Sequence, residues 1–392
     1  MSNPPLTEPG ASRPTMLEPL DVICFSHLRW NFVHQRPQHL MNRFAGKGRV
    51  FFIEEAVSDG NQSSLEISEP QPNIFVCVPH CPAARTPAEL DDVVLKLIDG
   101  LVEVHKPKDY ITWFYTPMML EWSRNLRPLA VIYDCMDELS GFKNAPPKLH
   151  ERERQLFSLA DLVFTGGQSL YEAKREQHKS IYAFPSSIDE EHFRKAKDDQ
   201  EDRPEQAEIR HPRVGFVGVI DERSDLELLE AVANLLSDMS FIMVGPVVKI
   251  DESSLPRRSN IYYLGQKSYD ELPAILSGWD VAMMPFALNE STRYISPTKT
   301  PEYLAAGLPV VCTPITDVVN PYGTMGLVRI ASTPEQFAAS ITAALEEDRA
   351  ERRKKAAEFL GGFSWDKTFN SMYELIADCV GKKSTQTAPA RV

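Results

Sequence analysis

The sequence predicts an α/β protein built from two doubly wound domains with parallel sheets that face a cleft. Three observations lead to this expectation. The chain has 392 residues, which suits two domains of about 100–200 residues each. Short apolar runs alternate with segments of helical periodicity along both halves, which is the pattern of βαβ units. A charged, apolar-poor stretch at 189–212 separates the halves and is typical of an interdomain linker.

The first domain is expected over 21–188. Its strands are predicted at short apolar runs, at 21–26, 50–53, 74–78, 110–115, 130–133, 162–165 and 181–184. One helix is expected to end near 45–46. Thr86 and Glu89 form a capping-box pattern with Pro87 at the first helical position, so another helix is expected from there to about Val104. Residues 1–20 carry several prolines and no apolar signal core, and we interpret them as a disordered tail.

The second domain is expected over 213–362. Its strands are predicted at 214–217, 241–244, 261–264, 281–284, 310–312 and 328–330, and its helices include 226–236 and 334–345. Near-continuous apolar strands fit sheets that are buried on both faces. Ligands of such folds bind beyond the carboxyl ends of the strands, so the loops after the strands are the expected places for chemistry.

Composition excludes several classes of protein. The chain has 42 Lys and Arg against 55 Asp and Glu, a net charge of −13, which argues against a nucleic-acid partner. No apolar run approaches the ~18 residues of a membrane span. The six cysteines are scattered, and Cys77, His80 and Cys81 do not complete a zinc site, so reduced, buried thiols in a cytoplasmic protein are expected. We expect no metal and no cofactor.

The most informative stretch is 296–311. Either Ser296 or Thr300 is expected to cap a helix there, and both choices place 296–301, with Thr298, at a helix N-terminus. Free backbone N–H groups and Lys299 favour an anion at that point. Glu302 in the first turn suits a pair of vicinal sugar hydroxyls. Phosphate and diol together indicate a nucleotide, although the same two residues also fit an ordinary i,i+3 surface pair.

This stretch resembles the donor-binding segment of GT-B glycosyltransferases of the family 4 type. Glu302 followed by the run AAGLPVV at 305–311 matches the second half of that segment. The segment's first glutamate would fall at Tyr294, and the stretch is similar to a variant in which Pro-x-Lys-x-x-Glu-Tyr replaces the glutamate-rich loop. The resemblance implies that Lys299 supports the diphosphate and Glu302 holds the ribose.

Other segments carry the same resemblance. The run 214–220 with Gly218 is similar to the strand that opens the donor domain, Arg223 follows where the family often keeps a phosphate-binding arginine, and the run 262–267 with Gly265 resembles the loop that receives the base. The resemblance implies a GT-B fold with Rossmann-like domains. Its expected parts are the acceptor-binding domain at 21–188, the linker at 189–212, the donor-binding domain at 213–362, a C-terminal helix crossing back at 363–380, and a flexible tail at 381–392.

The loop after the first strand is expected to line the cleft. It supplies the candidate acceptor-binding residues Arg29, Trp30, His34 and Arg36, and His27 directly after the strand is a candidate catalytic residue. Positive residues continue without an intervening acid as Arg29, Arg36, Arg43, Lys47 and Arg49, a patch that suits an anionic acceptor or a pyrophosphate lipid at a membrane surface. The alternative is that Trp30 and Phe32 anchor the core and the arginines are solvated.

Two further acids follow a strand of the first half. Asp134 and Asp137 are candidates for the base that accepts the proton of an acceptor hydroxyl. Each aspartate alone equally fits the capping of a turn. Many members of the resembled family carry a histidine where this chain has Met136, so the base is not carried over from the family.

The sequence therefore predicts a bacterial-type glycosyltransferase of the hexosyltransferase class. It would move a sugar from a nucleotide-sugar donor, a UDP-sugar, to a saccharide or lipid-linked acceptor in polysaccharide biosynthesis, as teichuronic-acid and exopolysaccharide enzymes do. The resemblance implies retention of anomeric configuration, and Arg223 with Lys299 predicts metal-independent chemistry. A cytoplasmic location is expected, with peripheral contact of the first domain at the plasma membrane left open. The alternatives are a nucleotide-sugar epimerase of the same fold and a sugar-nucleotide-binding protein that has lost catalysis.

Overall fold

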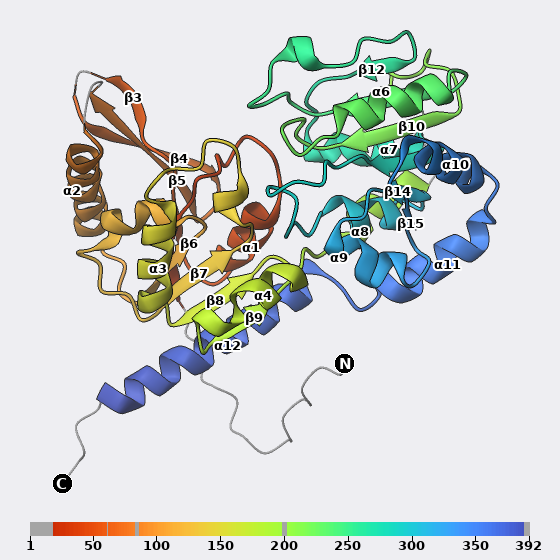
Figure 1. Ribbon diagram of the computed structural model, residues 1–392. Helices are drawn as coiled ribbons and strands as arrows, with labels where there is room; N and C mark the ends of the chain where they lie inside the picture. The colour runs from red at the N-terminus through yellow and green to blue at the C-terminus, as the bar shows by residue number, and fades with distance from the viewer. Residues whose placement is uncertain (1–18, 61, 83–85, 198–201, 388–392) are drawn as a thin grey trace, which may run out of the picture.

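The computed structural model describes residues 19–60, 62–82, 86–197 and 202–387, arranged as two α/β domains side by side (Figure 1). Most of the tail expected at 1–20 lies outside the described residues, and Leu20 at its end is buried. Within the described residues no helix is long and apolar enough to cross a bilayer.

The first domain contains a sheet of nine strands within the described residues. Its strands are β1 (Asp21–Phe25), β2 (Val50–Ile53), β3 (Val57–Gly60), β4 (Ser64–Gln71), β5 (Ile74–Pro82), β6 (Tyr110–Phe114), β7 (Val131–Cys135), β8 (Leu162–Thr165) and β9 (Ile181–Ala183). The order is β3-β5-β2-β1-β6-β7-β8-β9, and β4 pairs with β5 as the antiparallel strand of an otherwise parallel sheet. Strands β3 and β4 were not expected from the sequence, because β4 is mostly exposed and lacks an apolar run.

The second domain contains a parallel sheet of six strands within the described residues, and all six were expected. They are β10 (Arg213–Val217), β11 (Ser240–Val244), β12 (Ile261–Tyr263), β13 (Val281–Met284), β14 (Val310–Cys312) and β15 (Arg329–Ile330). Their order, β12-β11-β10-β13-β14-β15, is that of a doubly wound sheet. The direction of winding reverses between β10 and β13, and in the first sheet between β1 and β6. Crevices for ligands form at the carboxyl ends of strands at such reversals.

Helices cover both faces of each sheet, which buries the apolar strands (Figure 1). They are α1 (Arg36–Phe44), α2 (Pro87–His105), α3 (Leu149–Leu159), α4 (Gln168–Lys174), α5 (Glu190–Arg194), α6 (Leu226–Leu235), α7 (Leu272–Ser277), α8 (Lys299–Ala305), α9 (Thr316–Val318), α10 (Pro334–Leu345), α11 (Arg349–Leu360) and α12 (Trp365–Thr387). The capping box at Thr86 is present, with the Glu89 amide donating to the threonine hydroxyl. The expected α/β fold with two parallel-sheet domains is confirmed.

Helix α12 returns from the second domain to the first and packs along the underside of its sheet (Figure 1). Trp365, Phe369 and Met372 share one core cluster with β1 and β6. Asp366 forms an ion pair of 2.7 Å with Arg43 on α1. The helix continues to Thr387, whereas the sequence predicted a flexible tail from 381; residues 388–392 lie outside the described residues.

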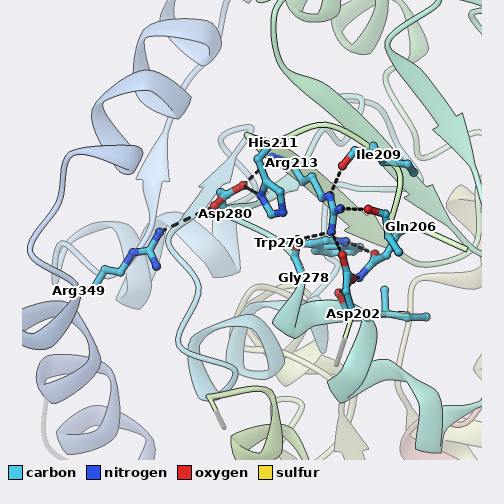
Figure 2. A network of polar contacts seen from close by, with 11 residues as sticks. Asp202, Gln206, Ile209, His211, Arg213, Gly278, Trp279, Asp280 and Arg349 are labelled. Atoms are coloured by element: carbon cyan, nitrogen blue, oxygen red, sulfur yellow. Dashed lines mark hydrogen bonds and ion pairs between the residues drawn. The ribbon is translucent and has the colours of Figure 1, made fainter. Parts of the chain in front are cut away.

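The stretch 189–212 is packed against the second domain rather than extended through solvent, apart from residues 198–201, which lie outside the described part. Phe193 on α5 belongs to the core cluster of that domain. Further along, the buried Arg213 guanidinium donates to the Ile209 and Gly278 carbonyl oxygens at 2.7 and 3.2 Å and pairs with Asp202 (Figure 2). The sequence predicted a solvated charge run, and several of its charged residues are exposed, but Asp202 pairs with the buried Arg213.

Candidate functional site

Three cavities with shared walls lie between the domains. The central cavity, of about 140 Å³, is lined by the loops after β1, β7 and β10 and by the start of α8. The Gln266 cavity, of about 500 Å³, lies toward the ends of β11 and β12. The Phe142 cavity, of about 400 Å³, lies toward the first domain and reaches Phe142 and Lys249. All three meet at Val219, beyond the carboxyl end of β10.

Helix α8 brings 296–299 to the wall of the central cavity. The helix begins at Lys299, within the expected range 296–301, but neither Ser296 nor Thr300 caps it. Thr298 occupies the N-cap position, has helical angles and makes no side-chain cap hydrogen bond. The Thr300 hydroxyl is buried and lies 3.7 Å from the sulfur of Met284 instead of capping the helix. Ser296, Thr298 and Lys299 line the central cavity as the donor-site prediction requires.

Lys299 and Glu302 form an ion pair of 2.5 Å, with side-chain exposures of 15% and 8%. Lys299 lines both the central and the Gln266 cavity. Among the described residues, Glu302 lines none of the three cavities, so its link to the cavity wall is the ion pair with Lys299. Burial raises the pKa of Glu302, and the Lys299 ammonium opposes that rise. The pair is therefore the i,i+3 pair considered from the sequence, placed at a cavity wall rather than on an outer surface.

Close backbone approaches shape the second-domain side of the site. Gly218 lines the central and Gln266 cavities. A Cβ on Gly245, where φ is +146°, would lie 1.8 Å from the Gly218 carbonyl oxygen. The two backbone segments therefore pack too closely for a side chain at position 245. Gly265 has φ of +68° and accepts a 2.8 Å hydrogen bond from the Gly245 amide. Gln266 and Lys267, which follow it, line the Gln266 cavity, whereas Gly265 itself does not.

Arg223 lies where the central cavity meets the Phe142 cavity. Asp221 accepts two hydrogen bonds from the Arg223 guanidinium. Nε donates to Oδ1 at 2.9 Å, and a second nitrogen donates to Oδ2 at 2.7 Å. The guanidinium also lies 5.5 Å from the centre of the Phe142 ring, which belongs to the first domain. The two hydrogen bonds fix the Arg223 guanidinium at the wall of the central and Phe142 cavities, which Asp137 also lines.

The structure corrects the prediction for Asp134. This carboxylate is fully buried on β7 and accepts hydrogen bonds of 2.9 and 2.8 Å from two nitrogen atoms of Arg36. A third Arg36 nitrogen donates to the Phe184 carbonyl oxygen at 2.7 Å. Asp134 therefore has no oxygen directed at the cavities, and Arg36, which reaches the central cavity wall, has its guanidinium engaged by protein groups. We assign this pair a structural role in place of base catalysis and acceptor binding.

Asp137 remains as the candidate base. It lines the central and Phe142 cavities, and within the described residues its carboxylate takes part in no hydrogen bond or ion pair. Burial raises its pKa to about 6, while Arg223 and Arg36 pull that pKa down. An acid with a pKa near the working pH is suited to proton transfer.

The expected basic patch is not present as a free surface. Arg29 pairs with the buried Glu54 at 2.8 Å, and Arg49 pairs with Asp21 at 2.6 Å. Arg36 and Arg43 are paired with Asp134 and Asp366, and Lys47 lies over the Tyr373 ring. Acids distant in sequence neutralise the arginines, which a run of local positive charges does not reveal.

Trp30 belongs mainly to the core of the first domain, whereas His34 lines the cavities. Trp30 is 9% exposed and packs edge-on against Phe52 in the core, although it also reaches the Gln266 cavity. His34 lines the central and Gln266 cavities and stacks on Tyr269 of the second domain at 4.3 Å. Burial lowers the pKa of His34 to about 4, so the ring is neutral near pH 7. His34 thus lies beside the predicted donor residues rather than among acceptor residues.

His27 and Arg29 line the Phe142 cavity. The Nδ1 atom of His27 is buried and has no hydrogen-bond partner within the described residues. Burial lowers the pKa of His27 to about 4, with a further contribution from Lys249. The ring is neutral and can serve as one hydrogen-bonding group of the cavity.

Sequence reasoning missed Phe142, Lys249 and Tyr269, and it placed Gln266 only as a member of the run 262–267. Phe142 and Lys249 lie in loops, and no local pattern marks either of them. Tyr269 alone follows a signal, the capping box of Ser268 and Glu271, which predicts a helix start but not the ring's stack on His34.

Comparison with solved structures identifies the fold. An Escherichia coli trehalose-6-phosphate structure bound with UDP-2-fluoro glucose superposes with a TM-score of 0.68 at 14% identity, covering 92% of this chain and 99% of that one. The Anabaena protein HepE in complex with UDP and glucose gives a TM-score of 0.64 at 15% identity, covering 91% and 99%. This chain has the GT-B fold of glycosyltransferases.

Sequence comparisons agree with the GT-B fold. Residues 211–347 match the family described as Glycosyl transferases group 1. A Bacillus subtilis (strain 168) protein, provisionally named as the teichuronic acid biosynthesis glycosyltransferase TuaH, is 25% identical over 202 residues. That match covers 47% of this chain and 50% of the relative, so the chain spans about half the length of the curated relative that it matches. The resemblance to GT-B glycosyltransferases seen in the sequence is confirmed.

Proposed function

We propose that this protein transfers a hexosyl group from a UDP-sugar to a saccharide or lipid-linked acceptor in polysaccharide biosynthesis. The observation that carries the proposal is the meeting of Lys299, Arg223 and Asp137 at one cavity between the domains. Two cations suit the diphosphate of a donor, and one carboxylate with a raised pKa suits the proton of an acceptor hydroxyl. The family match and the name of the Bacillus relative support the reaction class and the pathway.

The donor is proposed to occupy the Gln266 and central cavities. Its diphosphate would lie against Lys299 and Arg223, with Gly218 allowing close approach of the backbone. UDP is favoured as the carrier because the Escherichia coli and Anabaena structures bind UDP compounds. Glu302 would reach the ribose only after Lys299 turns from it toward the phosphates, so we propose that donor binding separates this pair.

The reaction breaks the bond between the anomeric carbon and the diphosphate oxygen and forms one to the acceptor oxygen. Arg223 and Lys299 would stabilise the negative charge that grows on the departing diphosphate. Asp137 would accept the proton of the acceptor hydroxyl. Because these protein cations supply the charge stabilisation, we propose metal-independent transfer. The retaining outcome that we carry from the family resemblance requires the acceptor oxygen to bond on the face that the diphosphate leaves, so Asp137 would act on that same face.

The test is to incubate the full chain with a panel of UDP-sugars, with and without saccharide acceptors, and to follow UDP and sugar by NMR. A transferase hydrolyses its donor slowly when no acceptor is present, and it releases UDP faster when an acceptor takes the sugar. Conversion of a donor into its epimer without UDP release would instead favour the epimerase reading. Absence of donor binding, of UDP release and of epimerisation would overturn the proposal.

A further inference from the structure

We propose that the acceptor unit entering the Phe142 cavity is an uncharged pyranoside, held by its hydroxyl groups and its apolar face, rather than a phosphorylated or carboxylated sugar. The inference rests on the proposed function, since it names the acceptor class of that same site. It also replaces the anionic acceptor that the run of arginines in the sequence had favoured.

The position of the cavity fits an acceptor. It shares Asp137, Arg223 and Val219 with the central cavity, so a sugar inside it has a path for one hydroxyl to the proposed base. Its volume of about 400 Å³ lies within the usual range for small-molecule sites, roughly 300–1,000 Å³.

The cations of the cavity are already matched by acids. Arg29 pairs with Glu54 at 2.8 Å, and Arg223 pairs with Asp221 at 2.7 Å. Both acids are nearly buried, with side-chain exposures of 6% and 5%, whereas the Arg29 and Arg223 side chains are 39% and 26% exposed.

The remaining two cations offer no enclosed anion site either. Lys249 lies 3.9 Å from Glu222 and 5.2 Å from the centre of the Phe142 ring. Lys143 is exposed to solvent, which screens its charge. Arg223 is assigned above to the donor diphosphate. An anionic acceptor would therefore have to displace Glu54 from Arg29 or Glu222 from Lys249.

Two carboxylates, by contrast, face the cavity without partners. Within the described residues, the side chains of Glu55 and Asp137 make no ion pair and no hydrogen bond, and both line the cavity. Ionised carboxylates are acceptors only, so they bind hydroxyl groups and repel phosphate or another carboxylate. The buried, unpartnered Nδ1 of His27 adds one more hydrogen-bonding group.

An apolar wall completes the site. Met118, Met136, Leu139, Phe142 and Leu149 line the cavity beside these polar groups. A pyranose presents hydroxyl groups around its edge and C–H groups on its faces, so it matches a wall that is apolar in one part and carboxylate-lined in another.

The experiment compares matched pairs of probes on the full chain: methyl glucopyranoside and methyl galactopyranoside, each against its 6-phosphate. The readout is the rate of UDP release from the donor that the assay above selects. A probe that accepts the sugar accelerates this release, and a probe that binds without accepting the sugar slows it by excluding water. We expect the neutral member of at least one pair to act at a concentration about tenfold lower than its phosphate, a difference of about 1.4 kcal/mol.

The inference is overturned if a phosphorylated probe acts at an equal or lower concentration, or if no neutral probe acts at concentrations far above the common KM range of about 1 μM–1 mM. Loss of UDP release itself, with no probe added, would count against the proposed function instead. The same pairs would then be compared by saturation-transfer NMR, where preferential binding of the neutral probe still supports the acceptor class and preferential binding of the phosphate overturns it.

A variant tests the electrostatic origin of the preference. Glu55→Gln removes one unpaired carboxylate and is expected to narrow the discrimination against the phosphate by about two- to fivefold, the usual size for one solvent-exposed charge interaction. Glu103→Gln, on the exposed side of α2, is the matched control and leaves the discrimination unchanged. An unaltered ratio in Glu55→Gln would contradict the role given to this carboxylate.

Discussion

The Lys299 ammonium lies 2.5 Å from a Glu302 carboxylate oxygen at the wall of the interdomain cavities, and both side chains are largely buried. The lysine lines two of the cavities, whereas the glutamate lines none of the three. The glutamate thus neutralises the cation that we propose for the diphosphate.

Lys299→Met leaves the Glu302 carboxylate buried without its partner. Because the loss of a buried partner is costly, we expect the free energy of unfolding to fall by about 3–5 kcal/mol near pH 8. Burial already raises the pKa of Glu302, so the carboxyl group takes up a proton as the pH falls and the penalty shrinks toward about pH 5. Denaturant unfolding at both pH values measures this. The double variant Lys299→Met/Glu302→Gln should recover most of the loss, and an equal penalty at both pH values would contradict a buried, charged glutamate.

Asp137→Asn should separate catalysis from stability. Within the part of the chain that the structure describes, this side chain makes no hydrogen bond or ion pair, so the free energy of unfolding should change by less than about 1 kcal/mol. Transfer should fall by about 10²–10⁴-fold if Asp137 is the base. Wild-type kcat/KM should decline as the pH falls through about 6, because a base with this raised pKa becomes protonated there. Initial rates across pH test the assignment, and a profile without an inflection near that pH would argue against it.

Asp134→Asn should show the opposite behaviour. It leaves the buried Arg36 guanidinium with an uncompensated charge, and we expect a loss of about 3–5 kcal/mol in unfolding free energy. Replacing both members, as Arg36→Met/Asp134→Leu, should restore much of that stability. A fully stable but inactive Asp134→Asn protein would return this residue to the list of candidate bases.

Arg223→Lys tests the orientation of the second cation. A lysine keeps the charge but loses the fork that Asp221 holds, so kcat should fall by about 10²–10³-fold, as for other donors that stabilise developing charge. Asp221→Asn should give a smaller loss, since the arginine stays but is less firmly held. Similar activity in Arg223→Lys and the wild type would remove this residue from charge stabilisation.

The sequence predicts the sheets well because most strands of a doubly wound fold are buried apolar runs. Strands β3 and β4 escape prediction because they lie at a sheet edge and β4 is largely exposed. The 296–302 motif is local, so the sequence could predict that residues 296–299 lie at the cleft, but it did not predict that Glu302 would lie outside the cavity walls. The Arg36–Asp134 pair joins positions 98 residues apart, and no local pattern distinguishes that aspartate from Asp137, three residues later. Phe142 and Tyr269 gain their roles only when the two domains meet.

The most direct measurement is calorimetric titration of UDP into the wild type, Lys299→Met and Glu302→Gln, with the exposed Lys354→Met on α11 as a charge-matched control. We predict that Lys299→Met binds UDP about tenfold or more weakly, that Glu302→Gln also loses affinity, and that the control binds as the wild type does. Equal affinities in all four proteins would contradict the assignment of this lysine and glutamate to the donor nucleotide.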